Sequence, residues 1–511
     1  MPELIEWPCD YPDCENTVCR PRAICELCYE VRCDVHDTPV NHSCEAIQTN
    51  EEYRKRKSDN KQQYLRGIIE IAKENQQHLT SDAGRLRPNH KCQVIFPTDY
   101  EQFFESCRGS GFNVHLPLNW SDGMKWLIRI RQNCNHRVPA AIREATIRSE
   151  VLTLNTLRNK GVHAPRAWLP ANLERSELDS PELPFDYFFM EFLTGQTRPI
   201  PKNPWYPINL PEDELQLFIT EYARIQIQLS ELPLPYTQIG CLQPTLDGMK
   251  VGPIITRGTF QIPDPPYLLG PFNTQKERYL AHIDTTLNYI SRGAVSRRDP
   301  IDSYLWHLEL RELVDNCNIL DKPIEKVYLK HDDEKGDHFL WEDGKVVGII
   351  DWEWAYVTTF EEAFATPYIF YEDIDYIASD NIMTKAEKIL IGIYERHGRN
   401  DLAHCVSNGR LYHRLREIGQ YGSHFVKRGF REPFKDHLPP DFDLNPPRDD
   451  VDWRVYLMER YAEHGGLQDL MRKHGWTSDR AKQVAEEWHV EKEKKKKNKK
   501  EQEINEQKGE T

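Results

Sequence analysis

The stretch from residue 326 to residue 355, KVYLKHDDEKGDHFLWEDGKVVGIIDWEWA, constrains the fold of this chain more than any other segment. Its start, Val-Tyr-Leu at 327–329, is typical of a short buried strand. The Asp-Gly pair between Phe-Leu-Trp and Val-Val-Gly-Ile-Ile then predicts a tight β-hairpin. Asp333 lies in the loop before this hairpin and Asp351 directly follows its second strand. The hairpin would therefore bring two carboxylates into one cleft.

Two carboxylates in one cleft suit phosphoryl transfer. One orients an acceptor hydroxyl and takes its proton, and the other holds magnesium on the nucleotide phosphates. The stretch resembles the aminoglycoside phosphotransferase and choline kinase-like family, whose signature is His-Gly-Asp, Asn five residues later, a hairpin, and Ile-Asp-Trp-Glu. Residues 331–333, His-Asp-Asp, stand at the first motif, and residues 350–353 match the second letter for letter. The resemblance implies that Asp333 is the catalytic base and Asp351 a magnesium ligand.

One position departs from this signature, because the metal-binding Asn of the family falls on His338. Neutral imidazole is a poorer ligand for Mg²⁺ than an amide or carboxylate oxygen. Three alternatives follow: Asp337 or a water replaces the ligand, one metal site is weak, or the domain binds nucleotide without catalysing transfer. Asp351 and His338 are the candidate magnesium residues.

Upstream segments follow in the order that the resemblance requires. Gly109 and Gly111 form a candidate phosphate-covering turn, although a lone Gly-x-Gly is more often an ordinary hairpin. After an Asp-Gly turn, a strand is predicted from Trp126 to Arg131, in which Arg129 alternates with Leu127. Arg129 lies where the family has a basic residue that contacts the α- and β-phosphates.

A helix with Pro139 near its first turn and Gly161 as its stop is predicted next, and Glu150 borders its apolar face. Glu150 is the expected ion-pair partner of Arg129, although a solvated helix glutamate is the ordinary alternative. The segment FDYFFMEFLTGQT is predicted to be a strand and hinge, where backbone groups of Glu191 and Leu193 would bind adenine.

The segment from Trp352 to Tyr376 is rich in acids and aromatic residues. Carboxylates beside aromatic faces suit a cationic acceptor such as an amine, although most of these acids are typical of a helix surface. The acceptor stays open, since a fold-level resemblance does not transmit substrate identity. The expected partners are therefore ATP with Mg²⁺ and a hydroxyl-bearing small molecule.

The first 44 residues hold seven of the thirteen cysteines. In a chain without an export signal such a cluster is more typical of metal binding than of disulfides. Eight ligands predict two tetrahedral zinc sites: Cys9, Cys14, Cys25, Cys28, Cys33, His36, His42 and Cys44. The pattern resembles AN-one-type zinc fingers, which implies one ion on Cys9, Cys14, Cys33 and His36 and another on Cys25, Cys28, His42 and Cys44. Cys19 is an alternative to Cys14, and such a finger could recruit a protein partner.

The length of 511 residues predicts several domains, and the net charge of −15 disfavours duplex nucleic acid as a partner. No apolar run is long enough for a membrane helix, and the acidic start is unlike a secretory signal. We therefore expect a cytoplasmic protein, with nuclear import through the lysine run near the end as the alternative.

We predict an α+β chain with a bilobal protein kinase-like fold, in which a small antiparallel-sheet lobe precedes a larger helical lobe. The expected parts are a zinc-binding module at 1–46, a helical linker at 47–90, the small lobe at 91–195, the large lobe at 196–478 and a disordered lysine-rich tail at 479–511. The function predicted is phosphate transfer from ATP to a hydroxyl. The alternative is a degenerate kinase-like adaptor, and a nucleic-acid-binding zinc protein ranks last.

Overall fold

A computed structural model describes residues 6–8, 14–15, 17–19, 50–106, 113–132, 138–175, 183, 185–197, 210–256, 266–293, 295, 299–334, 336–370, 381–416, 418–419, 429–447 and 449–509. The chain divides into two compact units. The first comprises residues 1–273, 323–371 and 384–407, and the second comprises residues 274–322, 372–383 and 408–511.

A five-stranded antiparallel sheet forms the first layer of unit 1. Its strands, in spatial order, are β3 (Cys92–Val94), β4 (Asn113–Trp120), β5 (Lys125–Arg131), β7 (Tyr187–Glu191) and β6 (Ala167–Trp168). Along β4 the side chains alternate, because Leu116 and Leu118 are buried whereas Pro117 and Asn119 are exposed. This two-residue period gives the sheet one apolar face that must be covered.

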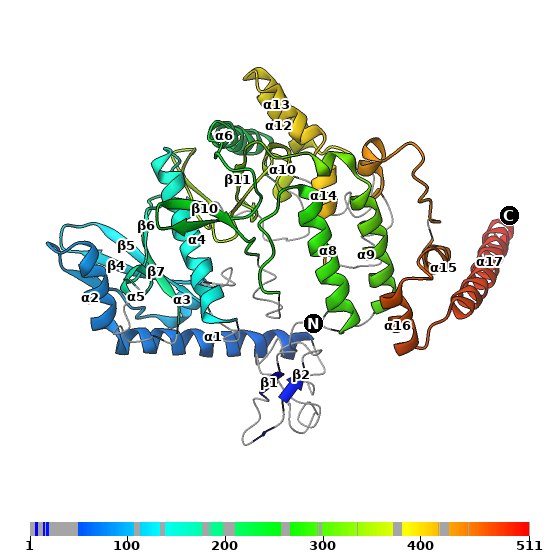
Figure 1. The fold of residues 1–511 in the computed structure, drawn as a ribbon, viewed down its shortest axis with the longest axis horizontal. Helices are drawn as coiled ribbons and strands as arrows, with labels where there is room; N and C mark the ends of the chain where they lie inside the picture. Colours follow the sequence, from blue (N-terminus) through cyan, green and yellow to red (C-terminus); the bar gives the residue numbers. More distant parts are fainter. Residues whose placement is uncertain are drawn as a thin grey trace. The chain divides into compact units, whose positions relative to one another are not determined.

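Helices α1 (Asn50–Glu74) and α2 (Gln76–Leu86) provide part of that cover (Figure 1). Leu65, Ile69 and Ala72 of α1 are fully buried in one apolar cluster with residues of β4 and β5. Helices α1 and α2, which form most of the predicted linker at 47–90, therefore contribute to the hydrophobic core of unit 1. A helical stripe in the sequence shows that one face is apolar, but not which surface covers it.

The helix predicted after Pro139 is confirmed as α4 (Ala140–Asn159), flanked by the short helices α3 (Tyr100–Ser106) and α5 (Ala171–Arg175). Pro139 is its N-cap residue, and Ile147, Val151 and Leu154 are buried as expected. Gly161 has a φ of +83°, the left-handed conformation that ends helices.

The predicted hairpin is also confirmed. Strands β12 (Phe339–Glu342) and β13 (Lys345–Ile349) pair antiparallel, and β8 (Gln196–Thr197) extends the sheet beside β12. Asp343 and Gly344 have φ values of +48° and +77°, as a tight two-residue turn requires. The strand expected at 327–329 corresponds to β11 (Tyr328–Lys330), which pairs with β14 (Tyr356–Thr358).

Further elements complete the part of unit 1 that the structure describes. They are the paired strands β1 (Glu6–Pro8) and β2 (Thr17–Cys19), the hairpin β9 (Cys241–Thr245) and β10 (Gly248–Gly252), the helices α6 (Glu212–Ser230), α10 (Phe360–Ala363), α12 (Lys385–Arg396) and α13 (Asn400–Ser407), and the 3₁₀ turn η3 (Tyr368–Phe370).

Unit 2 is helical in its described residues. The antiparallel helices α8 (Gln275–Ser291) and α9 (Pro300–Asp315) pack with α14 (Arg410–Arg416), α15 (Asp450–Arg460), α16 (Gly465–Lys473) and the 3₁₀ turns η2 (Asn318–Asp321) and η4 (Glu432–His437). Leu305, Trp453 and Leu467 are fully buried in its core. The structure thus separates these helices from the rest of the predicted large lobe at 196–478.

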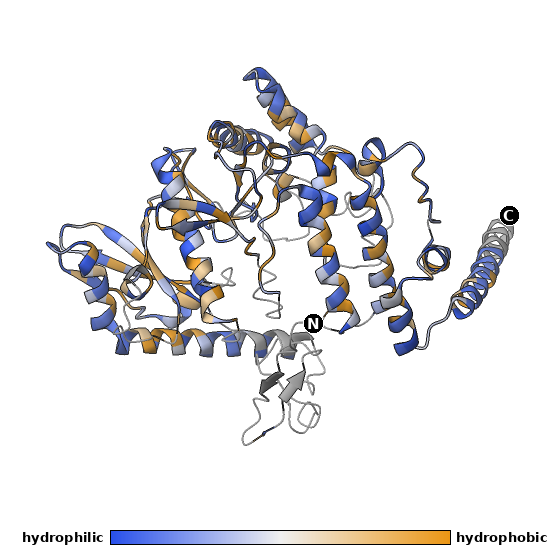
Figure 2. Ribbon diagram, in the orientation of Figure 1, coloured by the Kyte–Doolittle hydropathy of each residue, from blue (hydrophilic) through white to orange (hydrophobic). Residues whose placement is uncertain are grey.

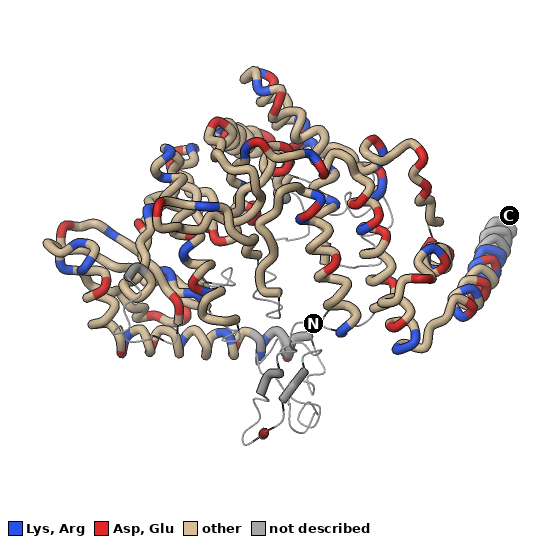
Figure 3. Tube along the Cα trace, in the orientation of Figure 1, with Lys and Arg blue, Asp and Glu red and all other residues tan. Residues whose placement is uncertain are grey.

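The lysine-rich end of the chain is a helix, α17 (Ser478–Gly509), and not the disordered tail that we predicted. Ala481 and Ala485 are buried, whereas residues 491–498 are exposed and include side chains of both charges (Figures 2 and 3). The Glu491–Lys495 pair at 2.7 Å is one source of helix stability. Glu, Lys and Gln are also good helix formers, so low hydrophobicity alone does not prevent a helix here.

The described residues combine antiparallel sheets with helices, which confirms the predicted α+β class. Among these residues, no helix has both the length and the apolar composition needed to cross a membrane.

Candidate active site

Arg129 of β5 is at the centre of a buried charged cluster, defined here as Arg129, Arg131, Glu150, Asp351 and Glu353. Its Nη2 donates to Asp351 Oδ1 at 2.8 Å and lies 3.1 Å from Glu150 Oε1. The predicted ion pair between strand and helix is therefore present. One guanidinium joins β5, α4 and the end of β13.

The second arginine of the charged cluster was not predicted. Arg131 Nη1 donates to Glu353 Oε2, and its Nη2 lies 3.4 Å from Glu150 Oε2. Asn113 of β4 also donates to Glu353, at 2.9 Å. Since Arg131 is two residues after Arg129, strand alternation places both guanidinium groups on one face of the sheet. This spacing was the signal that could have revealed Arg131.

The charged cluster holds two positive and three negative side chains. Burial raises the pKa of Glu150 to about 7 against the opposing charges of Arg129 and Arg131. Burial also acts to raise the pKa of Asp351, but Arg129 outweighs it and holds that pKa at about 2. The Asp351 side chain is 38% exposed, unlike Arg129 at 5%, so its carboxylate is the member of the pair that a ligand can reach.

Arg129 has one further polar neighbour and one unused donor. Its Nη1 lies 3.1 Å from Nε2 of His115, whose pKa falls to about 3 through burial and the Arg129 charge. The His115 ring is therefore neutral and accepts this hydrogen bond. Arg129 Nε is buried without a hydrogen-bond partner among the described residues.

The loop that carries Asp333 is tied to the segment that carries Asp351. The His331 ring bonds through Nε2 to the Ile350 carbonyl at 2.8 Å, and the Ile350 amide donates to the His338 carbonyl at 2.9 Å. Asp333 itself is 8% exposed. A hydrogen bond from the His331 side chain therefore joins the loop of Asp333 to the residue that directly precedes Asp351.

Two aspartates of these loops have left-handed backbones. Asp332 has a φ of +66° and Asp351 a φ of +67°. Glycine adopts this conformation without cost, and aspartate is among the few other residues that tolerate it. Asp332 stands where the resembled signature has glycine. The left-handed backbone at this position explains why it takes glycine or a residue that tolerates a positive φ. Strained non-glycine residues of this kind are concentrated at functional sites.

His338 lies in the loop as expected, but its contacts do not favour metal binding. Its ring is 3% exposed and lies between His331, at 4.3 Å, and Phe339, at 4.0 Å. The Gly336 amide donates to His338 Nδ1 at 3.3 Å. A neutral ring that accepts at Nδ1 carries its proton on Nε2, and then has no lone pair left for a cation.

The segment predicted as strand and hinge contains β7, which ends at Glu191. The Glu191 amide donates to the Arg166 carbonyl at 2.8 Å, so this amide is not available to a ligand. Leu193 is half-buried and close to Gly348 of β13. Adenine binding by the Leu193 backbone and the Glu191 carbonyl stays a prediction.

The acidic and aromatic segment after Asp351 is mostly structural where it is described. Glu353 belongs to the charged cluster, and buried Glu362 accepts from the hydroxyls of Tyr356 and Thr358. These two carboxylates are not available to a cationic acceptor. The acids at 372, 373 and 375 lie outside the described residues.

Several predicted site residues also lie outside the described residues. They are Gly109, Gly111 and seven of the eight zinc ligands, namely Cys9, Cys25, Cys28, Cys33, His36, His42 and Cys44. The eighth, Cys14, is half-buried. Both zinc sites stay predictions.

No family model matches this chain, and no curated protein is similar enough to be counted as a relative. Solved structures of aminoglycoside phosphotransferases show a distant similarity. ADP-bound APH(2'')-Ib has 10% identity and a TM-score of 0.34, with 65% of this chain and 96% of that chain covered. APH(4)-Ia with AMP-PNP and hygromycin B has 12% identity and a TM-score of 0.36, with 64% and 86% covered. The streptomycin–ATP complex of APH(2'')-IIa has 9% identity and a TM-score of 0.35, with 67% and 97% covered. With TM-scores below 0.5, the local geometry is the stronger guide to function.

Proposed function

We propose that this protein is an ATP-dependent phosphotransferase that moves the γ-phosphate to the hydroxyl of a small molecule. The observation that carries the proposal is the position of Arg129, which bonds to Glu150 of α4 and to Asp351 after β13. A basic strand residue held by a helix carboxylate, beside an aspartate that follows a hairpin, is the arrangement that phosphotransferases of the kinase type use on nucleotide phosphates.

The unused Nε–H of Arg129 supports phosphate binding. A buried donor without a partner costs about 1–3 kcal/mol, and a phosphate oxygen would satisfy it. Guanidinium groups suit phosphate because their donors are fixed in one plane. The exposed edge of Asp351 lies directly beside this donor's guanidinium.

The Mg²⁺ that such chemistry uses would be held by carboxylate oxygens, which Asp351 supplies and His338 does not. When bound, this ion would neutralise charge on the β- and γ-phosphates. Asp333 would orient the acceptor hydroxyl and take its proton while the acceptor oxygen bonds to the γ-phosphorus and the bond to the β-phosphate oxygen breaks. Arg129, fixed by Glu150, would hold the phosphates in line.

Label transfer from γ-labelled ATP into a fractionated extract tests the proposal, with Asp333→Asn as the comparison. Label that enters one product with wild type only would support the proposal and reveal the acceptor. Asp351→Ala should abolish the magnesium-dependent part of nucleotide stabilisation. Equal labelling by wild type and Asp333→Asn would contradict a catalytic role for Asp333.

The second candidate is a kinase-like adaptor that lacks catalysis and recruits a partner through its zinc finger. The contacts of His338 favour it, because they remove a ligand that magnesium would need. Nucleotide binding without any label transfer would support this reading over the first.

A further inference from the structure

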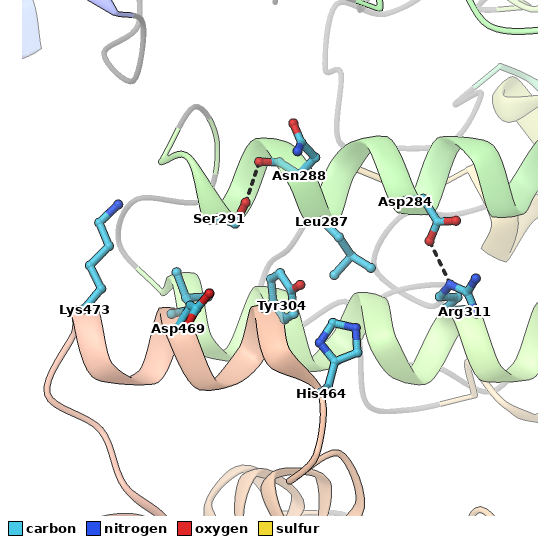
Figure 4. A pocket seen from close by; sticks show the side chains of 11 residues that line it. Asp284, Leu287, Asn288, Ser291, Tyr304, Arg311, His464, Asp469 and Lys473 are labelled. Carbon is cyan, nitrogen blue, oxygen red and sulfur yellow. Dashed lines mark hydrogen bonds and ion pairs between the residues drawn. The ribbon is translucent and has the colours of Figure 1, made fainter. Parts of the chain in front are cut away.

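A pocket of about 410 Å³ lies within unit 2, between α8, α9 and α16 (Figure 4). Its walls come from the C-terminal half of α8, from α9 and from the whole length of α16. Its volume is within the range of small-molecule sites, about 300–1,000 Å³. All of its lining residues belong to unit 2, and none is part of the charged cluster of unit 1.

Tyr304 of α9 presents an unused hydroxyl to this pocket. Its side chain is 4% exposed, yet the hydroxyl makes no hydrogen bond to any described residue. Burial, and then Asp284 and Asp469, raise the pKa of Tyr304, so the hydroxyl keeps its proton and can both donate and accept. A buried side chain that opens such a group into a cavity favours a polar ligand there.

The first turn of α16 and the His464 ring lie next to this hydroxyl. A Cβ placed on Gly466 would be 2.3 Å from Tyr304 Oη, so the hydroxyl lies directly against the first turn of α16. His464 caps that turn, because its Nδ1 accepts from the Leu467 amide at 3.3 Å. Because Nδ1 accepts, Nε2 is the ring nitrogen of His464 that can donate. Figure 4 shows His464 and Tyr304 facing the same space between the helices.

The charges of the pocket balance. Asp284 pairs with Arg311 at 2.7 Å, and Asp469 and Lys473 add one charge of each sign from α16. A net charged ligand would therefore meet as much repulsion as attraction. Leu287 and Leu470 are buried and add an apolar part to the lining.

A hydroxyl group donates one hydrogen bond and accepts others, so it suits mixed donors and acceptors. Two neighbouring hydroxyls can bind a carboxylate–guanidinium pair such as Asp284–Arg311, where one donates to the carboxylate and the other accepts from the guanidinium. We propose that this pocket binds a small, uncharged, polyhydroxylated molecule of hexose or cyclitol size. The proposal is independent of phosphate transfer, because it rests only on residues of unit 2.

Saturation-transfer NMR and calorimetry on the full-length protein test the proposal with four probes. Glucose and myo-inositol are uncharged, glucosamine is a cation, and glucose 6-phosphate is an anion. We expect saturable binding of at least one uncharged probe, tighter than that of either charged probe. Tyr304→Phe should weaken this binding about five- to tenfold, the value of one hydrogen bond.

The matched control is Tyr279→Phe, which alters a buried tyrosine of α8 outside the pocket lining and should leave the affinity unchanged. Gly466→Ala should also weaken binding, because the new methyl group displaces the Tyr304 hydroxyl. If that variant fails to fold, Tyr304→Phe alone decides the question. No saturable binding of either uncharged probe, tighter binding of a charged one, or equal affinity in wild type and Tyr304→Phe would each overturn the proposal.

Discussion

Replacing Arg129 by methionine removes one of two positive charges from the charged cluster of unit 1. With all three carboxyl groups ionised, the net charge of its five side chains changes from −1 to −2, since one arginine then faces Glu150, Asp351 and Glu353. Removing one partner of a buried ion pair typically costs about 3–5 kcal/mol. Because Asp351 is 38% exposed and water can partly solvate it, we expect the lower end, about 3 kcal/mol.

The measurement must report on unit 1 alone, because two units can unfold in separate steps. Hydrogen exchange followed by mass spectrometry gives such a local value for peptides of β4 and β5 in the full-length protein. Arg143→Met is the matched control, since Arg143 makes one ion pair, with Asp186 at 2.8 Å, in which both side chains are half-buried, and donates to the Val138 carbonyl. The control should lose no more than about 1 kcal/mol.

A second variant separates charge from packing. Arg129→Met with Glu150→Gln returns the net charge of the five side chains to −1, and should therefore recover about 1–2 kcal/mol of the loss. If Arg129→Met costs no more than Arg143→Met, the ion pairs around Arg129 contribute little. If the double variant is as unstable as the single one, lost packing and not charge explains the effect.

Three further changes have defined outcomes. The pKa of Glu150 is about 7 in the folded protein against 4.5 as its ordinary value, so its contribution to stability is present below pH 4.5 and is lost as the pH rises to 7. Glu150→Gln should therefore flatten the plot of unfolding free energy against pH between 4.5 and 7. An unchanged plot would contradict the raised pKa. His338→Asn should tighten magnesium-dependent nucleotide binding several-fold in calorimetry if the lost ligand limits it, and no gain would mean that other groups hold the ion. A chelator should release two zinc ions per chain from residues 1–46, counted by metal analysis, while nucleotide binding stays nearly constant. Loss of both together would mean that nucleotide binding depends on the zinc-binding module.

The sequence predicted the local elements of the site because local rules decide them. An Asp-Gly pair between apolar runs specifies the β12–β13 turn, and a proline start with a glycine stop specifies α4. The turn and the helix need only a few neighbouring residues. The Arg129–Glu150 pair joins a strand to a helix, and it was expected from the resemblance to a family rather than from a local rule.

Tertiary packing decides what the sequence did not predict. The stripe on α1 is as compatible with a linker as with a core helix, and only the apolar sheet face explains why Leu65 and Ile69 are fully buried. Glu353 was read as part of a motif and an acidic segment, whereas its partner Arg131 is more than 200 residues away in sequence. The segment of helix α17 was predicted to be disordered because it has few apolar residues, although its many Glu, Lys and Gln residues favour a helix.

The chemical difference between arginine and lysine at position 129 bears on whether this protein is a catalyst or an adaptor. A lysine could neutralise Glu150 and Asp351 as a point charge, but it would have no Nε–H. The arginine keeps a buried donor without a partner in the described residues, at a cost of about 1–3 kcal/mol. If Arg129 only joined β5 to α4, the unpaired Nε–H would destabilise the protein without any benefit. If Arg129 also binds an anion, the anion accepts this hydrogen bond and offsets the cost in the bound state. This unused donor therefore favours a site that binds phosphate. Whether the bound phosphate is transferred depends on Asp333, the candidate base.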